Sequence, residues 1–267
     1  MNLLDNFLKS SSFIPENGIF YQRGITRSNE FEKNYLTIRE KEGRIYPDEI
    51  VRNLPDFPNL LPQREEWTAR KITMMKLIGY LGKRNSSGPI LELGCGNGWL
   101  AHHLAVSTDH EICGVDINER ELLQGARLFN SCKDLIFVYG NIFTADIKTQ
   151  AFGTIVLSSS IQYFPSVKLL INRLFELLQP SGEIHVVDSP LFRTKDGARE
   201  AKGRSDVYFT ARGLPVMTES YFHHTLMDLK DFSHRILFNH RAPLTLLKRK
   251  ILKMPQMVFP WVLIKQH

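Results

Sequence analysis

The hydrophobic and polar positions of the chain change their spacing after Pro89. Short apolar runs follow one another there, separated by segments in which apolar residues recur every three or four positions. This alternation is typical of a parallel sheet whose strands are joined by crossover helices, so it predicts a doubly wound α/β core. The runs that we expect to form strands are ILEL at 90–93, EICGV at 111–115, LIFVY at 135–139, TIVLS at 154–158 and EIHVVD at 183–188.

Helix-type spacing is found both between these runs and before them. Met74, Leu77, Ile78 and Leu81 repeat at helical intervals, and Gly82 follows them, which predicts a helix over 65–81. The first sixty residues contain several prolines and favour only short helices. The other expected helices are 29–41, 48–53, 98–106, 118–130 and 166–178.

The chain becomes less regular beyond Asp188. We expect an irregular, mildly basic insert at about 190–230 with one helix at 217–229, and then strands at 233–239 and 259–265. The predicted organisation is therefore an N-terminal helical cap, residues 1–64, followed by one α/β domain, residues 65–267.

Composition narrows the class of protein without locating a site. The 267 residues are 43% hydrophobic and 23% charged, which is ordinary for a globular protein. The N-terminus lacks the apolar core of a signal peptide, and no apolar stretch is long enough to cross a bilayer, so we expect a cytoplasmic protein with no membrane partner. Three cysteines without a CxxC pair indicate neither a disulfide framework nor a zinc site. The net charge of +6 leaves an anionic partner such as RNA open.

The most informative segment is the glycine-rich turn after the first expected core strand. The sequence Gly94-Cys95-Gly96-Asn97-Gly98 leads from that strand into a helix, a place where backbone amides meet a ligand. A dinucleotide-binding GxGxxG motif would need a third glycine where Trp99 stands. Glu92 would repel a pyrophosphate and attract an ammonium group. A nucleoside that carries an amino acid fits this site, because its ammonium group suits Glu92 and its carboxylate suits the backbone amides of the turn.

Glu92, Gly94, Gly96 and Gly98 resemble motif I, E/DxGxGxG, of the class I S-adenosylmethionine-dependent methyltransferases. Residues 90–187 as a whole resemble the type 11 methyltransferase domain. The resemblance implies a Rossmann-like, mostly parallel, seven-stranded sheet whose last strand is the antiparallel FPWVLIK segment. It implies S-adenosylmethionine as cofactor and S-adenosylhomocysteine as product, and we expect no metal.

Further motifs extend the expected cofactor site. Asp116 ends the second core strand, where a carboxylate accepts hydrogen bonds from ribose hydroxyls, while Asn118 with Glu121 three residues on predicts a helix cap. By resemblance, Asn141 and Ile142 meet the adenine, and Ser158 contacts the methionine portion. The expected cofactor-binding residues are Glu92, Gly94, Cys95, Gly96, Asp116, Ile117, Asn141, Ile142 and Ser158.

The catalytic residues are less determined, because methyl transfer requires mainly alignment, and a general base only for a protonated acceptor. The candidate bases are Tyr163 and His223, with Asp188 and His224 beside them in the segments that face the methyl group in this fold. Arg70 is a candidate partner for the cofactor carboxylate.

Three functions remain open at the level of the sequence. The first is methyl transfer to an oxygen or nitrogen of a small-molecule acceptor, such as a metabolite, sugar or natural product. The second is an RNA-directed methyltransferase, favoured by the net charge and by Lys248, Arg249, Lys250 and Lys253. The third is a noncatalytic protein that binds the cofactor only.

Overall fold

The computed structural model describes residues 3–59, 61–83, 88–252 and 257–266. These residues form one nine-stranded sheet in the order β1-β2-β5-β4-β3-β6-β7-β9-β8. The strands are β1 Phe13–Glu16, β2 Ile19–Gln22, β3 Ile90–Leu93, β4 Ile112–Asp116, β5 Leu135–Tyr139, β6 Phe152–Ser158, β7 Leu178–Val187, β8 Ser233–Phe238 and β9 Trp261–Lys265.

The centre of the sheet is parallel and its edges are antiparallel. Strands β2, β5, β4, β3, β6 and β7 pair in parallel, β1 runs antiparallel to β2, and β9 runs antiparallel to both β7 and β8. All seven strands expected from the sequence are present, and the order reverses between β4 and β6 around β3, which makes the fold doubly wound. The predicted α/β class is therefore confirmed.

The expected number of seven strands is wrong, because the N-terminal segment adds the hairpin β1–β2 to the sheet. Asn17 and Gly18 form its two-residue turn with φ angles of 49° and 79°, the left-handed backbone that an Asn-Gly turn favours. Strand β2 then pairs with β5. The segment before residue 65 is thus not only helical, and the division at 64/65 stays a prediction.

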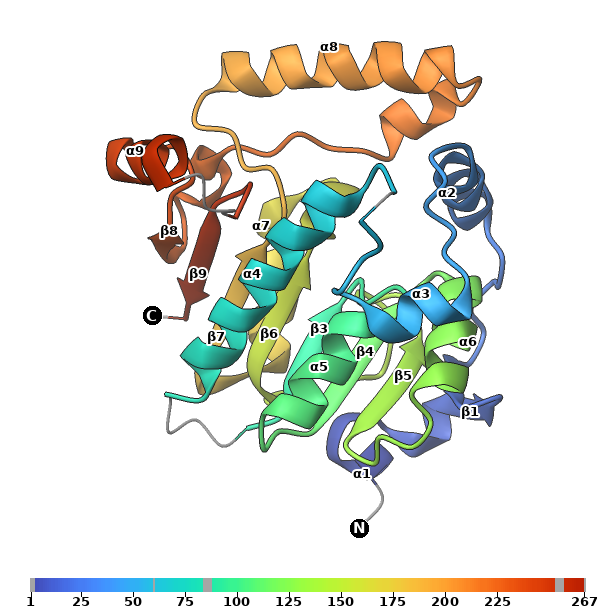
Figure 1. Ribbon diagram of the computed structural model, residues 1–267. Helices are drawn as coiled ribbons and strands as arrows, with labels where there is room; N and C mark the ends of the chain where they lie inside the picture. Colours follow the sequence, from blue (N-terminus) through green and yellow to red (C-terminus); the bar gives the residue numbers. More distant parts are fainter. Residues whose placement is uncertain (1–2, 60, 84–87, 253–256, 267) are drawn as a thin grey trace.

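The helices cover both faces of the sheet. Helices α4, α5 and α6 lie on one face and α7 on the other (Figure 1), and each face has its own buried apolar cluster. Helices α2 and α8 lie beyond the carboxyl ends of the strands (Figure 1). The helices are α1 Leu3–Phe7, α2 Glu30–Lys41, α3 Asp48–Asn53, α4 Arg64–Leu81, α5 Trp99–Ser107, α6 Glu119–Leu128, α7 Val167–Leu177, α8 Lys195–Ala211 and α9 Pro243–Leu252, with 3₁₀ turns η1 Ser10–Ser12, η2 Ile161–Tyr163, η3 Pro215–Glu219 and η4 Leu226–Leu229.

The insert beyond Asp188 differs from the expectation. The residues between 195 and 211 form the regular helix α8, which Thr194 caps by accepting the N–H of Gly197. The single helix predicted at 217–229 is wrong, because the chain forms η3 and η4 there with an extended stretch between them. Met217, Phe209 and Ile38 bury one another, so η3, α8 and α2 form a separate apolar cluster.

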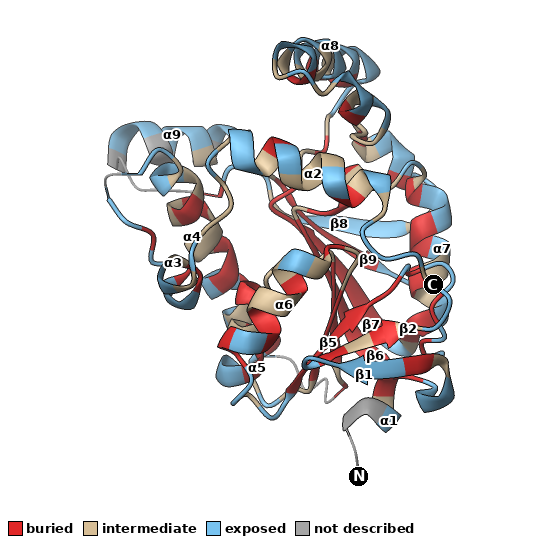
Figure 2. Cartoon of the chain, turned by 90° about the vertical axis from the view of Figure 1, so that its right-hand side faces the viewer, coloured by how far each residue is buried: buried red, intermediate tan, exposed pale blue. Residues whose placement is uncertain are grey.

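Burial falls off sharply away from the sheet. Figure 2 shows the central strands of the sheet largely buried, whereas the edge strands β1 and β8 and most of α8 and α9 are exposed. In the part of the chain that the structure describes, no helix combines the length and the apolar character needed to span a membrane. The side chains of Lys248 and Arg249, and Lys253 as a whole, lie outside the described residues.

Candidate functional site

The glycine turn after β3 packs too tightly for side chains. Gly94 has a φ of +77°, and a Cβ atom there would lie 2.4 Å from the Cβ of Ser160. Gly98 has a φ of +71°, and a Cβ atom there would lie 2.3 Å from the ring of Phe137. Both positions therefore need glycine, and the backbone of the turn lies open at the carboxyl end of the sheet.

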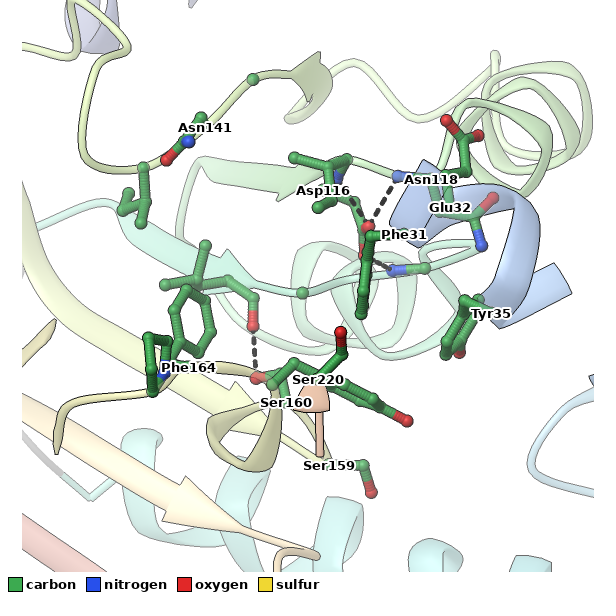
Figure 3. A pocket seen from close by; sticks show the side chains of 18 of the residues that line it. Phe31, Glu32, Tyr35, Asp116, Asn118, Asn141, Ser159, Ser160, Phe164 and Ser220 are labelled. Atoms are coloured by element: carbon green, nitrogen blue, oxygen red, sulfur yellow. Dashed lines mark hydrogen bonds between the residues drawn. The ribbon is translucent and has the colours of Figure 1, made fainter. Parts of the chain in front are cut away.

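A cavity of about 400 Å³ opens beside this turn. Phe31 and Tyr35 project into it from α2, and Ser159, Ser160 and Phe164 reach it from the segment after β6 (Figure 3). We call it the larger cavity, to distinguish it from a smaller one that adjoins it. Its lining residues are Phe31, Glu32, Tyr35, Leu93, Gly94, Gly96, Asp116, Ile117, Asn118, Glu121, Gly140, Asn141, Ile142, Phe143, Ser159, Ser160, Tyr163, Phe164, Pro165, Glu219, Ser220 and Phe222.

A smaller cavity of about 100 Å³ adjoins the larger one on the other side of the glycine turn. The two share the lining residues Tyr35, Gly94, Gly96, Glu121 and Ser159. The smaller cavity is otherwise lined by Arg39, Arg44, Tyr46, Glu66, Trp67, Arg70, Glu92, Cys95, Asn97, Trp99 and Ser158.

Two buried polar atoms of the smaller cavity have no hydrogen-bond partner among the described residues. They are Glu92 Oε2 and Ser158 Oγ, and both residues are less than a tenth exposed. Burial raises the pKa of Glu92 well above its ordinary value, opposed by the N–H of Ala101 and by the charge of Arg70. Buried polar atoms are normally paired, so these two indicate a hydrogen-bonding ligand, and a carboxylate favours a cationic one.

Asp116 lies where β4 ends, on the wall of the larger cavity. Its Oδ2 accepts the N–H of Gly96 at 2.7 Å, and its Oδ1 accepts those of Ile117 at 2.7 Å and Asn118 at 2.8 Å (Figure 3). Burial raises the pKa of Asp116, and these three donors oppose that rise. Asp116 thus connects the glycine turn to the end of β4.

The far end of the larger cavity is formed by the loop after β5. Asn141 Oδ1 accepts the N–H of Phe143 at 3.0 Å, and Ile142 is buried beside it. Gln22 of the β1–β2 hairpin accepts the N–H of Asn141 at 3.0 Å. The loop presents an apolar side chain and a polar edge, as a planar base requires, and it is supported by a hairpin that sequence reasoning missed.

A series of alternating charges connects the end of α2 with α4 beside the smaller cavity. Glu42 pairs with Arg39 and Arg44, both at 3.2 Å. Glu66 pairs with Arg44 at 2.6 Å and with Arg70 at 3.0 Å. Burial raises the pKa of Glu66, but its two arginines outweigh it and hold the value at about 2. Of these five residues, sequence reasoning singled out only Arg70, because charges that come from separate segments of the chain form no local motif.

The two predicted catalytic residues lie in different places. Tyr163 lines the larger cavity, and its hydroxyl accepts from Arg39 Nη2 at 3.5 Å. His223 lines a separate hollow against α8, where its Nε2 lies 2.9 Å from Ser205 Oγ. The ring of Tyr221 lies between them, with centroids 5.6 Å from Tyr163 and 5.2 Å from His223. The structure therefore brings Tyr163, but not His223, to the cavity.

Asp188 and Ser159 follow the adjacent strands β7 and β6 in an unusual backbone conformation. Their φ angles are 49° and 54°, left-handed values that non-glycine residues adopt mainly at constrained sites. Ser159 Oγ donates to the carbonyl of Asp188 at 2.8 Å, and Thr73 Oγ donates to Asp188 Oδ1 at 2.7 Å. His224 Nε2 forms a hydrogen bond with the carbonyl oxygen of Phe164 at 2.9 Å.

The paired cavities fit the expected cofactor. Glu92 Oε2, Ser158 Oγ and Arg70 surround the space where an amino acid would bind, and the loop at Asn141 and Ile142 borders the space for a base. Within the described ranges, no three His, Cys, Asp or Glu residues are grouped so as to hold a metal ion. The absence of a metal requirement stays a prediction.

Comparison with known proteins agrees with this geometry. Residues 84–225 match the family described as "Methyltransferase domain". A stretch of 98 residues is 26% identical to an uncharacterized methyltransferase of Mycobacterium tuberculosis. That match covers 37% of this chain and about half, 49%, of the relative.

Solved structures share the fold at low sequence identity. Geranyl diphosphate C-methyltransferase from Streptomyces coelicolor superposes with a TM-score of 0.55 at 12% identity, over 90% of this chain and 98% of that one. An S-adenosylmethionine-dependent methyltransferase from Mesorhizobium loti gives 0.53 at 15% identity, over 74% and 98%. Since the family match spans more than half of the sequence and coincides with the cavity-forming strands, the chain belongs to the methyltransferase domain family.

Proposed function

We propose that this protein transfers a methyl group from S-adenosylmethionine to an oxygen or nitrogen of a small-molecule acceptor. The observation that carries the proposal is the pair of unpartnered buried atoms, Glu92 Oε2 and Ser158 Oγ, in a cavity continuous with one suited to adenosine. Glu92 and Ser158 accept hydrogen bonds from the cofactor ammonium, and Arg70 pairs with its carboxylate.

The rest of the cofactor set orients the adenosine. Asp116 holds the turn at Gly96 in place, and Ile117 and Ile142 line the base-binding end of the larger cavity. Asn141 supplies a polar edge for the base. Gly94 and Cys95 bring backbone close to the methionine portion. The cofactor supplies a methyl group on a positively charged sulfur, and the chain contributes alignment and exclusion of water.

The acceptor side supports a small substrate. Aromatic rings line the larger cavity, where Tyr163 packs edge to face on Phe31 and Tyr35, with ring centroids 5.8 Å and 5.7 Å away. A concave cavity of about 400 Å³ lined by aromatic side chains suits a small molecule better than a nucleic acid strand. The geranyl diphosphate methyltransferases of the same fold act on a small molecule, which agrees with this reading.

Tyr163 is the group best placed to act on an acceptor proton. Burial raises its pKa, and the charge of Arg39 opposes that rise, so at neutral pH Tyr163 orients the acceptor by hydrogen bonding. A base role for His223 stays a prediction that would require the segment after η3 to move toward the cavity.

The test uses S-adenosylmethionine with a deuterated methyl group, incubated with the protein and an extract of the source organism. After separation into metabolites, RNA and protein, we expect the label in metabolites, and its loss with Glu92→Gln. Label in the RNA fraction would favour the RNA-directed alternative. Cofactor binding without transfer to any fraction would favour the noncatalytic one.

A further inference from the structure

The ribose of the proposed cofactor presents two hydroxyl donors, and Asp116 has room for one. A carboxylate has about four acceptor positions. Three of those on Asp116 are filled by the N–H groups of Gly96, Ile117 and Asn118. A second acceptor is needed at the same place, because a hydroxyl buried without a partner is costly.

Glu121 supplies such an acceptor. It lies in the first turn of α6 and lines both cavities, so it lies at their junction, between the base end and the amino-acid end. Its Oε2 accepts from Asn118 Nδ2 at 2.8 Å, and its Oε1 has no partner among the described residues. A Cβ atom on Gly96 would lie 3.2 Å from Glu121 Oε2, so the carboxylate reaches the glycine turn itself.

We propose that Glu121 is a second ribose-binding carboxylate, which accepts one hydroxyl of the cofactor diol while Asp116 accepts the other. This inference rests on the proposed function. The capping role expected for the pair Asn118 and Glu121 is also present, since Asn118 Oδ1 accepts the N–H of Glu121 at 3.1 Å. That cap uses the main chain of Glu121 and leaves its Oε1 free for a ligand.

The charges around Glu121 give the proposal a distinctive pH signature. Burial, then the charge of Asp116, raises the pKa of Glu121 to about 7, while Arg39, Arg70 and Arg120 lower it. A donating hydroxyl favours the ionised carboxylate, so binding should lower this pKa. Affinity for a diol is then expected to be low below pH 7 and higher above it.

Other ionisable groups also face this junction, so the experiment must distinguish their titration from that of Glu121. Glu92 and Cys95 lie on the glycine-turn side, and Tyr35 and Tyr163 on the side of α2 and η2. Glu92 is the main concern because it would bind an ammonium group. The probe is therefore 5′-methylthioadenosine, which keeps the base and the diol and has no ammonium group.

The experiment is calorimetric titration of the full-length protein from pH 6 to 8. S-adenosylhomocysteine at pH 7.5 comes first: if the wild-type protein does not bind it, the proposed function fails. With 5′-methylthioadenosine, we expect wild-type affinity to rise up to about tenfold across this range, as a pKa change near one unit implies. We expect Glu121→Gln to remove that rise and to weaken binding at pH 8 about tenfold.

Two controls make the result specific. The first is Glu119→Gln, on the same helix but outside both cavities, which should keep the wild-type pH profile. If Glu121→Gln does not fold, Glu121→Met replaces it as the test variant. The 2′,3′-dideoxy analogue should bind the wild-type protein and Glu121→Gln equally. The proposal is overturned if Glu121→Gln retains the wild-type pH profile, or if this variant loses as much affinity for the dideoxy analogue as for 5′-methylthioadenosine. It is also overturned if a wild-type protein that binds S-adenosylhomocysteine does not bind 5′-methylthioadenosine.

Discussion

At the scale of single residues, we expect the buried position of Glu92 to serve ligand binding at a cost to stability. Its carboxylate is buried with one oxygen unpartnered. Glu92→Gln keeps the shape and removes the charge, so we expect affinity for S-adenosylhomocysteine to fall about 10- to 100-fold, as loss of a charge-assisted hydrogen bond implies. The melting temperature at pH 8 should stay equal or rise, because a buried carboxylate is removed. A lower melting temperature with unchanged affinity would contradict this role.

Asp188 gives a second residue-level prediction, about stability and pH. Burial raises its pKa to about 6 from an ordinary 3.8, although Arg70 and Thr73 oppose the rise. An acid whose pKa is raised in the folded state contributes stability at low pH that is lost as pH rises through the folded value. Asp188→Asn removes that loss and suits the left-handed backbone.

The advantage of Asp188→Asn over wild type in unfolding free energy should therefore grow between about pH 4 and 6, by up to about 3 kcal/mol, and then level off. Urea denaturation at a series of pH values measures it. Asp196→Asn, at a position whose side chain is 79% exposed, is the control and should show no such growth. A constant difference across this range would contradict the raised pKa.

The residues predicted from the sequence were those that a local motif marks. Glu92, Gly94, Gly96 and Asp116 are close in the sequence to strand ends, so the fold class alone places them at one edge of the sheet. Glu121 and Arg39 depend on how side chains from separate helices converge, which spacing does not encode.

At the scale of elements, we predict that the glycine turn tolerates no added side chain, and a glycine in helix α8 provides the control. Gly98→Ala places a methyl group against Phe137 with a positive φ, so we expect a loss of about 2 kcal/mol or more in unfolding free energy. Gly203→Ala in α8 meets nothing within 4 Å and should add roughly 0.5–1 kcal/mol through helix propensity. Equal effects at the two positions would show that the turn is not constrained as described.

The elements that the sequence misplaced have physical explanations. The hairpin β1–β2 is short and includes Pro15, although its Asn17-Gly18 turn was a usable signal. Helix α8 is polar along most of its length and buries little besides Ala198, Ala201 and Phe209, so its apolar periodicity is weak. The residues at 217–229 have helical spacing. In the structure, Met217 and Leu229 are buried in different apolar clusters, so the chain extends from one cluster to the other and does not form a single helix.

At the scale of the whole molecule, the sheet depends on its last strand. Strand β9 lies between β7 and β8 and pairs with both, and four of its residues, Trp261 to Ile264, are buried. A chain ending at Met257 loses that strand, so we expect no cooperative thermal transition. A chain ending at Lys265 keeps β9 and should melt like the full-length protein. A cooperative transition in the shorter chain would contradict the role of β9.

The central claim, that the two joined cavities bind an adenosyl amino acid, is tested most directly by calorimetric titration with S-adenosylhomocysteine beside NADH. We expect micromolar binding of S-adenosylhomocysteine and none of NADH. We also expect the first to be lost in Asp116→Ala, which removes the acceptor that holds Gly96. Tight binding of NADH without binding of S-adenosylhomocysteine would contradict the account.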